Sequence, residues 1–349
     1  MKVTKSALTD ALSKIKRVKG VVLPFTEVIL DFSDEPVLFF KTYDAFGKIS
    51  VPAEISEKER TQVKVSLDYL SSVISACPEG IIDITVENNL NIKSGRFEAK
   101  VTLTNLYDYE REEMRNLISF LEQTSLEVVS SSIEEIREVA WVSNIKETRA
   151  EDYLINTAFC EDKYWYCANP QLMIRKVKET SDLDTKVPYP LLRMLDMDIY
   201  AITYTESFIV SQIGANLMIG FANIEGKFPP CKRIYESISE IPVLATFSIT
   251  EELISSLKRI IKSSAENTYL EVSLFSDEIM LHIMSNTIDV ADVVKQDIEK
   301  NSGVLGFKTN PITFLVACEN MKDGKAIFRG KDHPLEIQKD DKQVIALIV

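Results

Sequence analysis

Three stretches of the chain carry apolar residues at the spacing of an amphipathic helix. They are residues 4–18, 131–145 and 250–262, and in each the apolar positions recur so that they share one helix face. Ser132 and Thr250 stand near the starts of the second and third stretches, where a side-chain hydroxyl can cap a helix. The pattern therefore predicts three long amphipathic helices.

A shorter helix is predicted about 60 residues after each long one, at 66–77, 188–197 and 310–320. Each short helix is followed by alternating apolar residues interrupted by turn-forming residues, which indicates antiparallel hairpins. The hairpins are predicted within residues 83–101, 202–221 and 326–348.

Repetition of the same element order indicates three similar α+β domains, each with two helices packed on one face of an antiparallel sheet. We place the domains at residues 1–120, 121–240 and 241–349. Residues 106–128 and 236–247 then join neighbouring domains, and the first of these connections is expected to be helical in part. The alternative is accidental repetition in an α+β chain, and the agreement of all the predicted helices with one spacing argues against it.

The chain is acidic as a whole, but its first helix is basic. With 53 acidic and 40 basic side chains the net charge is −13, which excludes a protein that binds nucleic acid over its whole surface. Residues 2–19 nevertheless hold six basic side chains against Asp10, a net charge of +5. The helix dipole favours bases near a helix end but does not explain this concentration on one helix. We therefore favour a phosphate-facing surface over a merely solvated basic face.

Residues with catalytic or metal-binding chemistry are sparse. Five cysteines without a Cys-x-x-Cys pair predict free thiols in a reducing compartment, and neither a disulfide framework nor a zinc site. His282 lies in a strand-like run and His333 in a turn, and no phosphate loop or nucleophile elbow is present. We expect a protein that is not an enzyme and needs no cofactor or metal. No apolar run reaches the roughly 18 residues of a membrane span, so we expect a soluble protein without a membrane partner.

Several segments resemble the bacterial beta sliding clamps, the family of the DNA polymerase III beta subunit. Ile-Glu-Gly-Lys-Phe-Pro at 224–229, followed by Lys-Arg-Ile at 232–234, is similar to the segment that closes the second domain of that family. Residues 92–97 resemble the matching segment of its first domain. Shorter similarities lie at residues 42–44, 51–54, 147–149 and 306–307. The resemblance covers the whole chain and agrees with the threefold repetition.

This resemblance implies a DNA-clamp fold and a head-to-tail homodimeric ring whose helices line a hole around double-stranded DNA. Such a processivity factor has no active site, works with a clamp loader and tethers the replicative DNA polymerase, in the bacterial cytoplasm or in a phage-infected cell. Sheet edges of the first domain would meet the third domain of the partner chain, with Phe97 and Ile261 as candidate contacts. The candidate DNA-facing residues are Lys16, Arg17, Lys19, Arg149, Lys258 and Arg259.

Family members also bind partner peptides in an apolar cleft between the second and third domains. Carried over by position, the cleft would contain Leu154, Met173, Pro229, Arg233, Ile234, Val344, Ala346 and Ile348. Without the resemblance, these residues would be interpreted as ordinary strand core. The chain departs from the family pattern at residues 169–173, at Lys308 and Pro311, and at its C-terminal end, 346–349. We therefore expect a reshaped cleft and a divergent clamp, of a kind that a phage could encode for its own polymerase.

Two other interpretations stay open at this point. The same fold and cleft could serve a platform for transcription or repair proteins, or a ring of different oligomeric state. An enzyme is the second class of alternative, with Asp31, Asp44 or Cys167 as the residues that a hydrolase would use.

Overall fold

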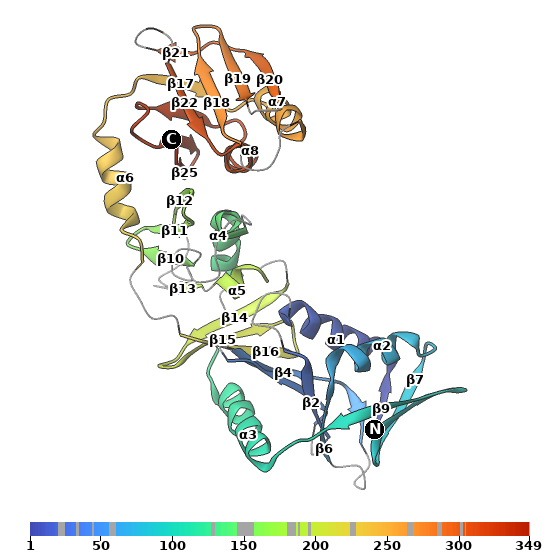
Figure 1. Ribbon diagram of the computed structural model, residues 1–349. Coiled ribbons are helices and arrows are strands. Elements are labelled where there is room, and N and C mark those ends of the chain that lie inside the picture. The colour runs from blue at the N-terminus through green and yellow to red at the C-terminus, as the bar shows by residue number, and fades with distance from the viewer. Residues whose placement is uncertain are drawn as a thin grey trace. The chain divides into compact units, whose positions relative to one another are not determined.

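The computed structural model combines helices with antiparallel strands (Figure 1). It describes residues 1–19, 25–32, 35–43, 45–55, 61–126, 130–144, 157–179, 186–187, 189–194, 197–223, 228–263, 268–284, 288–300, 303 and 305–348. The chain divides into two compact units, of which unit 1 comprises Met1–Ile133 and Arg193–Ile224. Unit 2 comprises Glu134–Leu192 and Glu225–Val349. The mixture of helix and antiparallel sheet confirms the predicted α+β class.

The three long predicted helices form at α1 (Lys5–Lys19), α4 (Ser130–Ala140) and α7 (Glu251–Lys262). The short ones form at α2 (Leu67–Ala76), α5 (Tyr189–Leu192) and α8 (Pro311–Asn320). Side-chain caps fix several of the starts, since Thr250 accepts a hydrogen bond from the Leu253 amide at 3.2 Å and Asn310 accepts one from the Thr313 amide at 3.1 Å. A 3₁₀ turn (Trp141–Asn144) continues α4.

Unit 1 is built on one long antiparallel sheet whose strand order is β14-β15-β16-β4-β3-β2-β6-β9-β8-β7-β1-β5. The chain contributes β16 and β4 from predicted domains two and one, and they pair from Leu217 with Ile49 to Phe221 with Ala45. At this junction the backbones approach closely, because a Cβ atom on Gly47 would lie 2.8 Å from the Met218 carbonyl oxygen of β16. The strands are β1 (Lys2–Thr4), β2 (Glu27–Asp31), β3 (Val37–Lys41), β4 (Ala45–Ser50), β5 (Ala53–Glu54), β6 (Gln62–Ser66), β7 (Ile81–Val86), β8 (Asn89–Ser94), β9 (Phe97–Thr104), β14 (Ile199–Tyr204), β15 (Phe208–Ile213) and β16 (Leu217–Ala222).

Unit 2 contains a nine-stranded sheet, β13-β10-β11-β12-β25-β24-β23-β17-β21, and a four-stranded sheet, β20-β19-β18-β22, among its described residues. Here β12 of predicted domain two pairs with β25 of predicted domain three, from Leu172 with Ala346 to Lys176 with Lys342. The strands are β10 (Ala158–Glu161), β11 (Tyr164–Ala168), β12 (Leu172–Val177), β13 (Lys186–Val187), β17 (Ala245–Ser248), β18 (Leu270–Leu274), β19 (Glu278–Met284), β20 (Asp289–Lys295), β21 (Glu299–Lys300), β22 (Leu305–Thr309), β23 (Lys325–Phe328), β24 (Leu335–Lys339) and β25 (Lys342–Ala346). Pairing thus crosses the predicted domain limits within each unit, and the threefold domain division itself stays a prediction.

Two further helices are α3 (Asp108–Gln123), which lies within the predicted connection 106–128, and α6 (Cys231–Ser239), which begins before the predicted connection 236–247 and overlaps only its start. Helix α3 buries Met114 and Leu121 against Phe39 and Phe46 of the unit 1 sheet, and Val210 of β15 joins the same core. It therefore covers strands on both sides of the β4–β16 junction, and Figure 1 shows it on the sheet face opposite to α1 and α2.

Ion pairs hold the charged flank of α3 to the same face. Lys64 of β6 lies 2.8 Å from the Glu110 carboxylate, Lys41 pairs with Glu113, and Lys48 pairs with Glu122. Burial lowers the pKa of Lys64, but the carboxylates of Glu110 and Glu27 outweigh it and hold that pKa above its ordinary value. The connection between predicted domains is thus a docked helix rather than a loose linker.

Replacing Met114 or Leu121 with Ala should lower the free energy of unfolding of unit 1 by about 2–5 kcal/mol, because each fully buried side chain leaves a cavity under α3. Asn116→Ala, on the exposed face of the same helix, should change it by less than about 0.5 kcal/mol. Urea unfolding followed by circular dichroism measures both. Equal effects from the buried and exposed variants would show that α3 is not docked.

Candidate functional site

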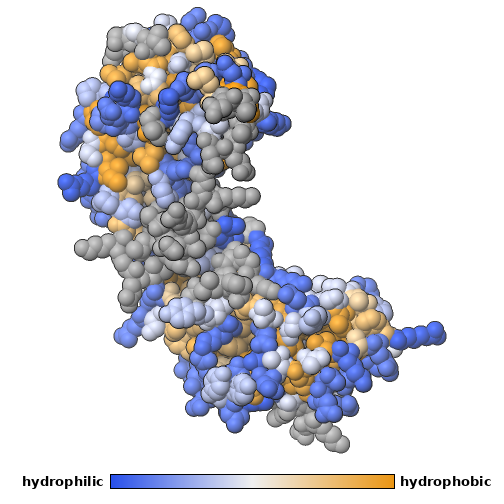
Figure 2. Space-filling view, viewed as in Figure 1, coloured by the Kyte–Doolittle hydropathy of each residue, from blue (hydrophilic) through white to orange (hydrophobic). Residues whose placement is uncertain are grey.

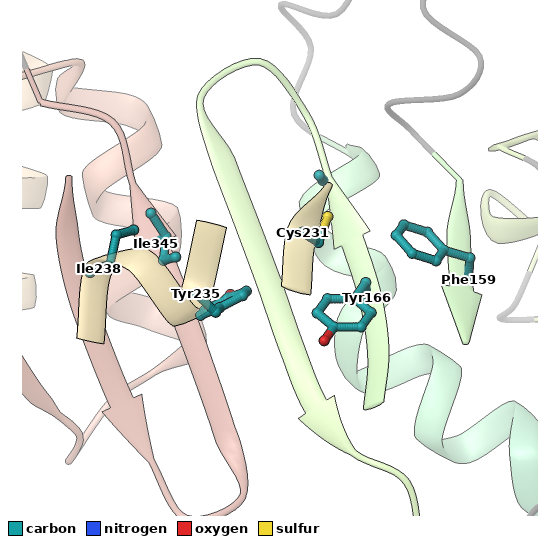
Figure 3. Close-up of a cluster of buried hydrophobic side chains, with 7 residues drawn as sticks. Phe159, Tyr166, Cys231, Tyr235, Ile238 and Ile345 are labelled. Carbon is teal, nitrogen blue, oxygen red and sulfur yellow. The ribbon is translucent and has the colours of Figure 1, made fainter. Parts of the chain in front are cut away.

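Helix α6 covers an aromatic face formed by strands β10, β11, β12 and β25 (Figure 3). Side chains alternate along a strand, so Phe159, Tyr166 and Ile345 all point to this face and pack with Tyr235 and Ile238 of the helix. The Phe159 and Tyr166 rings stack with centroids 5.3 Å apart. The face is therefore a continuous core that joins the strands on both sides of the β12–β25 pairing.

Tyr235 connects the helix to both strands of that pairing. Its hydroxyl lies 3.1 Å from the Met173 carbonyl oxygen and 2.8 Å from the Gln343 carbonyl oxygen, which share its proton. Burial raises the pKa of the Tyr235 hydroxyl well above its ordinary value, so it remains a neutral donor. The Arg175 guanidinium lies between the Tyr235 ring, at 4.2 Å, and the Tyr164 ring, at 4.7 Å.

The structure places the predicted cleft residues on two different faces of the strands. Met173 and Ile234 are half-buried and pack together on the aromatic core, Pro229 is half-buried, and Arg233 is exposed on α6. Val344 and Ala346 have no exposed surface and belong to the opposite face of β25. Ile348 is half-buried, and Leu154 lies outside the described residues.

The alternation along β25 explains this division. Met173 is the cross-strand partner of Ile345, so these two side chains share a face, whereas Val344 and Ala346 point the other way. Counting by two from Ile345 leads to Leu347, which is 54% exposed. The sequence prediction carried these positions over from the family resemblance, so it included Val344 and Ala346 but neither Ile345 nor Leu347, and a prediction of the β12–β25 register would have shown which residues share the face of Met173.

Further exposed apolar surface lies beside the end of β25. The Leu347 amide donates to the Gln171 carbonyl oxygen at 2.9 Å, and the Thr309 hydroxyl donates to the Leu347 carbonyl oxygen at 3.2 Å. The Gln171 side chain also bonds Thr313 in the first turn of α8, next to Ile312, which is 52% exposed. We use the name apolar strip for the half-buried or exposed apolar residues of this region, Met173, Pro229, Ile234, Leu347 and Ile312, together with the exposed Arg233. Figure 2 shows hydrophobic residues among hydrophilic ones on the visible face of this unit.

The predicted DNA-facing residues divide by unit. Lys16 and Arg17 are exposed on α1 of unit 1, and the side chain of Lys19 lies outside the described residues, as does Arg149. Lys258 and Arg259 are exposed on α7 of unit 2. Both are engaged in ion pairs, with Glu319 and Asp292 respectively.

The predicted dimer contacts lie on β9, which has one edge without a described strand partner near Phe97, and on α7, which packs on the edge strand β20. Strand β9 pairs with β8 from Phe97 to Thr102, and no described strand pairs with its other edge over these residues; the β6 pairing begins only at Leu103. In unit 2, β20 forms one edge of the four-stranded sheet. Phe97 at the start of β9 and Ile261 at the end of α7 are both half-buried.

The described residues that the enzyme alternative would use have contacts typical of structural residues. The Asp31 carboxylate accepts a hydrogen bond from Gln62 at 2.8 Å, and Asp44 lies outside the described residues. Burial raises the pKa of the Cys167 thiol to about 12, so it is not a thiolate at neutral pH. The described part of the chain holds no cluster of three or more potential metal ligands, and none of its helices is long and apolar enough to cross a membrane.

No protein-family model and no curated protein sequence matches the chain. Solved structures match the chain over its whole length. The DNA polymerase III beta subunit of Pseudomonas aeruginosa is 15% identical with a TM-score of 0.77, and the alignment covers 100% of this chain and 99% of that one. The beta chain of Streptococcus pneumoniae is also 15% identical, with a TM-score of 0.79 and coverage of 100% and 98%.

A third structure is the Helicobacter pylori beta clamp bound to a DNA ligase peptide, which is 14% identical with a TM-score of 0.75 and coverage of 100% and 99%. At such low identity the similarity establishes the fold, and it does so for the full chain. The sequence resemblance is thereby confirmed at this level: the chain has the fold of the bacterial DNA polymerase III beta sliding clamps, in a strongly divergent sequence.

Proposed function

We propose that this protein is a DNA sliding clamp, a processivity factor without catalytic activity that encircles duplex DNA and tethers the replicative DNA polymerase. The observation that carries the proposal is the agreement of fold with beta clamps over the full chain. A tether raises the local concentration of the polymerase at its template, so that dissociation no longer ends synthesis. A clamp loader would open the ring onto DNA, in the bacterial cytoplasm or in a phage-infected cell.

The ring would close through the two sheet edges. A second copy could add its β20 edge to β9 and continue the antiparallel sheet, with Phe97 of one chain beside Ile261 of the other. Such a contact joins different surfaces of identical chains, so it must be made twice to close a head-to-tail dimer. Three predicted domains in each chain would then give a ring of six.

The charge distribution fits a protein held on DNA by topology rather than by affinity. A net charge of −13 opposes tight binding to a polyanion, while the basic residues of the first helix can contact phosphates without reading sequence. An encircling ring needs only such weak contacts, because it cannot leave a closed duplex.

The apolar strip of unit 2 is the proposed docking surface for the polymerase and other partner peptides. The Helicobacter pylori clamp of the same fold binds a DNA ligase peptide, which supports peptide capture by this architecture. Here Met173, Ile234 and Leu347 offer apolar contacts for a peptide with Leu or Phe anchors, and the stem of Arg233 lies at the rim.

A linear duplex tethered to a bead should take up the protein through its free end and lose it again by the same route. If that end is blocked after uptake with a bulky bound protein, the clamp should survive a high-salt wash, because salt weakens charge contacts but not topology. Blocking the end before the protein is added is the control and should prevent uptake. Loss of the protein regardless of blocking would contradict encirclement.

For the docking surface, Met173→Asp should weaken binding of a synthetic peptide with Leu and Phe anchors by at least about tenfold, since an unpaired carboxylate would face an apolar anchor. Arg233→Ala should weaken it to a smaller extent, and its exposed site carries no risk to folding. Glu236→Gln, exposed on the same helix, is the matched control. Fluorescence anisotropy gives the affinities. Unchanged peptide binding by a folded Met173→Asp variant would show that the apolar strip is not the docking surface.

A further inference from the structure

Two of the three bases of helix α7, Lys258 and Arg259, are held by carboxylates of their own unit. The Lys258 ammonium lies 2.7 Å from the Glu319 carboxylate of α8. The Arg259 guanidinium donates through both Nη2, at 2.7 Å, and Nε, at 3.0 Å, to one oxygen of Asp292 on β20. Both cations are therefore paired before any DNA arrives.

A second hydrogen-bond donor holds the Asp292 carboxylate beside Arg259. The Ser256 hydroxyl, on the same helix as Arg259, donates to the same carboxylate oxygen at 2.6 Å. Burial raises the pKa of Asp292, but the hydrogen bonds from Ser256 and Arg259 outweigh burial and bring that pKa below its ordinary value. The carboxylate is thus ionised at neutral pH and is the more buried partner of the pair, with 27% of its side chain exposed against 61% for Arg259.

Helix α1 also has paired bases, since the Lys5 ammonium lies 3.0 Å from the Glu79 carboxylate, but one of its lysines is left exposed. Lys16 is exposed, and no ion-pair partner for it exists among the described residues. Lys14, two positions earlier, is paired with Asp10 at 2.8 Å. A carboxylate therefore neutralises this lysine within the chain, while Lys16 stays exposed. The sequence from residue 2 to residue 19 keeps a net charge of +5 after all its acids are counted.

Pairing within the chain changes what a base can contribute to DNA binding. A free lysine that contacts a phosphate releases a condensed counterion, and each such contact steepens the salt dependence of binding by roughly 0.9 in log–log slope. A base that must first leave a carboxylate exchanges one ion pair for another and leaves an anion near the phosphates. Such a base therefore adds little to affinity or to salt dependence.

We propose that Asp292 and Glu319 neutralise Lys258 and Arg259 of α7 within the chain, so that these two bases contribute less to DNA contact than the exposed Lys16 of α1. The proposal rests on the proposed clamp function and concerns how strongly the ring holds DNA. A ring that contacts phosphates with few free bases slides more readily, because each step along the duplex breaks fewer contacts.

The test compares salt dependence in variants of the full chain, using the anisotropy of a labelled linear duplex. Asp292→Asn combined with Glu319→Gln should steepen the slope by roughly one to two, the contribution of two freed bases. Glu252→Gln combined with Glu240→Gln removes the same charge from exposed acids without a described base partner, and should leave the slope unchanged. Equal steepening in both pairs of variants would reduce the effect to net charge and overturn the proposal.

A second comparison locates the contact. Lys16→Gln in the native chain should flatten the slope by roughly 0.9, whereas Lys258→Gln with Arg259→Gln should barely change it. In the Asp292→Asn, Glu319→Gln background, the same double substitution should restore the native slope. Flattening by Lys258→Gln and Arg259→Gln in the native chain, equal to that of Lys16→Gln, would contradict masking.

Folding and function have separate controls. Glu319 is exposed on its helix. If Asp292→Asn proves unstable, Glu319→Gln alone can therefore be tested, and it should give about half of the steepening. If the native ring is retained on end-blocked duplex but the slopes do not separate, only this inference fails. If the native chain associates with duplex at no salt concentration, the clamp function and this inference fail together.

Discussion

Backbone hydrogen bonds between β4 and β16, and between β12 and β25, join parts of the chain that the sequence assigns to different repeats. Each pairing turns two smaller sheets into one, and each is covered by a connecting helix, α3 in unit 1 and α6 in unit 2. The aromatic core under α6 follows from the β12–β25 pairing, because strands on both sides of that pairing contribute to it. A slip of one residue in either would turn every side chain of the strand to the other face.

The covering helices make the two junctions specific as well as stable. Tyr235 reaches carbonyl oxygens of both β12 and β25, so it fits only one register of that pairing. Lys41, Lys48 and Lys64 pair with carboxylates of α3 on the sheet face that this helix covers. By contrast, the edge of β9 near Phe97 and the edge of β20 are left without a described strand partner, which is where a ring of two chains would close.

Much of the fold could be predicted from the sequence because amphipathic helices and hairpins have local signatures. The stripes at α1 and α7 span several turns, and the repeated spacing of long and short helices identified the threefold pattern. Helix α6 escaped notice although Cys231, Tyr235 and Ile238 carry its apolar face, because a helix of nine residues offers few periods to recognise. Strand pairing between repeats could not be predicted, since it depends on contacts far apart in the chain.

The residues of the candidate surfaces were also harder to predict where they depend on contacts far apart in the chain. The resemblance led to Met173 and Ile234, which pack against one core, but also to Val344 and Ala346, which the structure buries on the face of β25 opposite to Ile345. Lys258 and Arg259 could be read as exposed bases on one helix face. Their carboxylate partners could not, because Glu319 and Asp292 reach them only through the packing of α7 on α8 and β20.

The most direct test of the clamp account is the solution mass of the protein, measured by light scattering over a concentration series. Two chains of 39.5 kDa, about 79 kDa in total, would be the mass of a closed ring of six repeats. That is the predicted result. A mass of 39.5 kDa at every concentration would leave the fold unchanged but contradict encirclement, and the protein would then have to hold its partners without holding DNA.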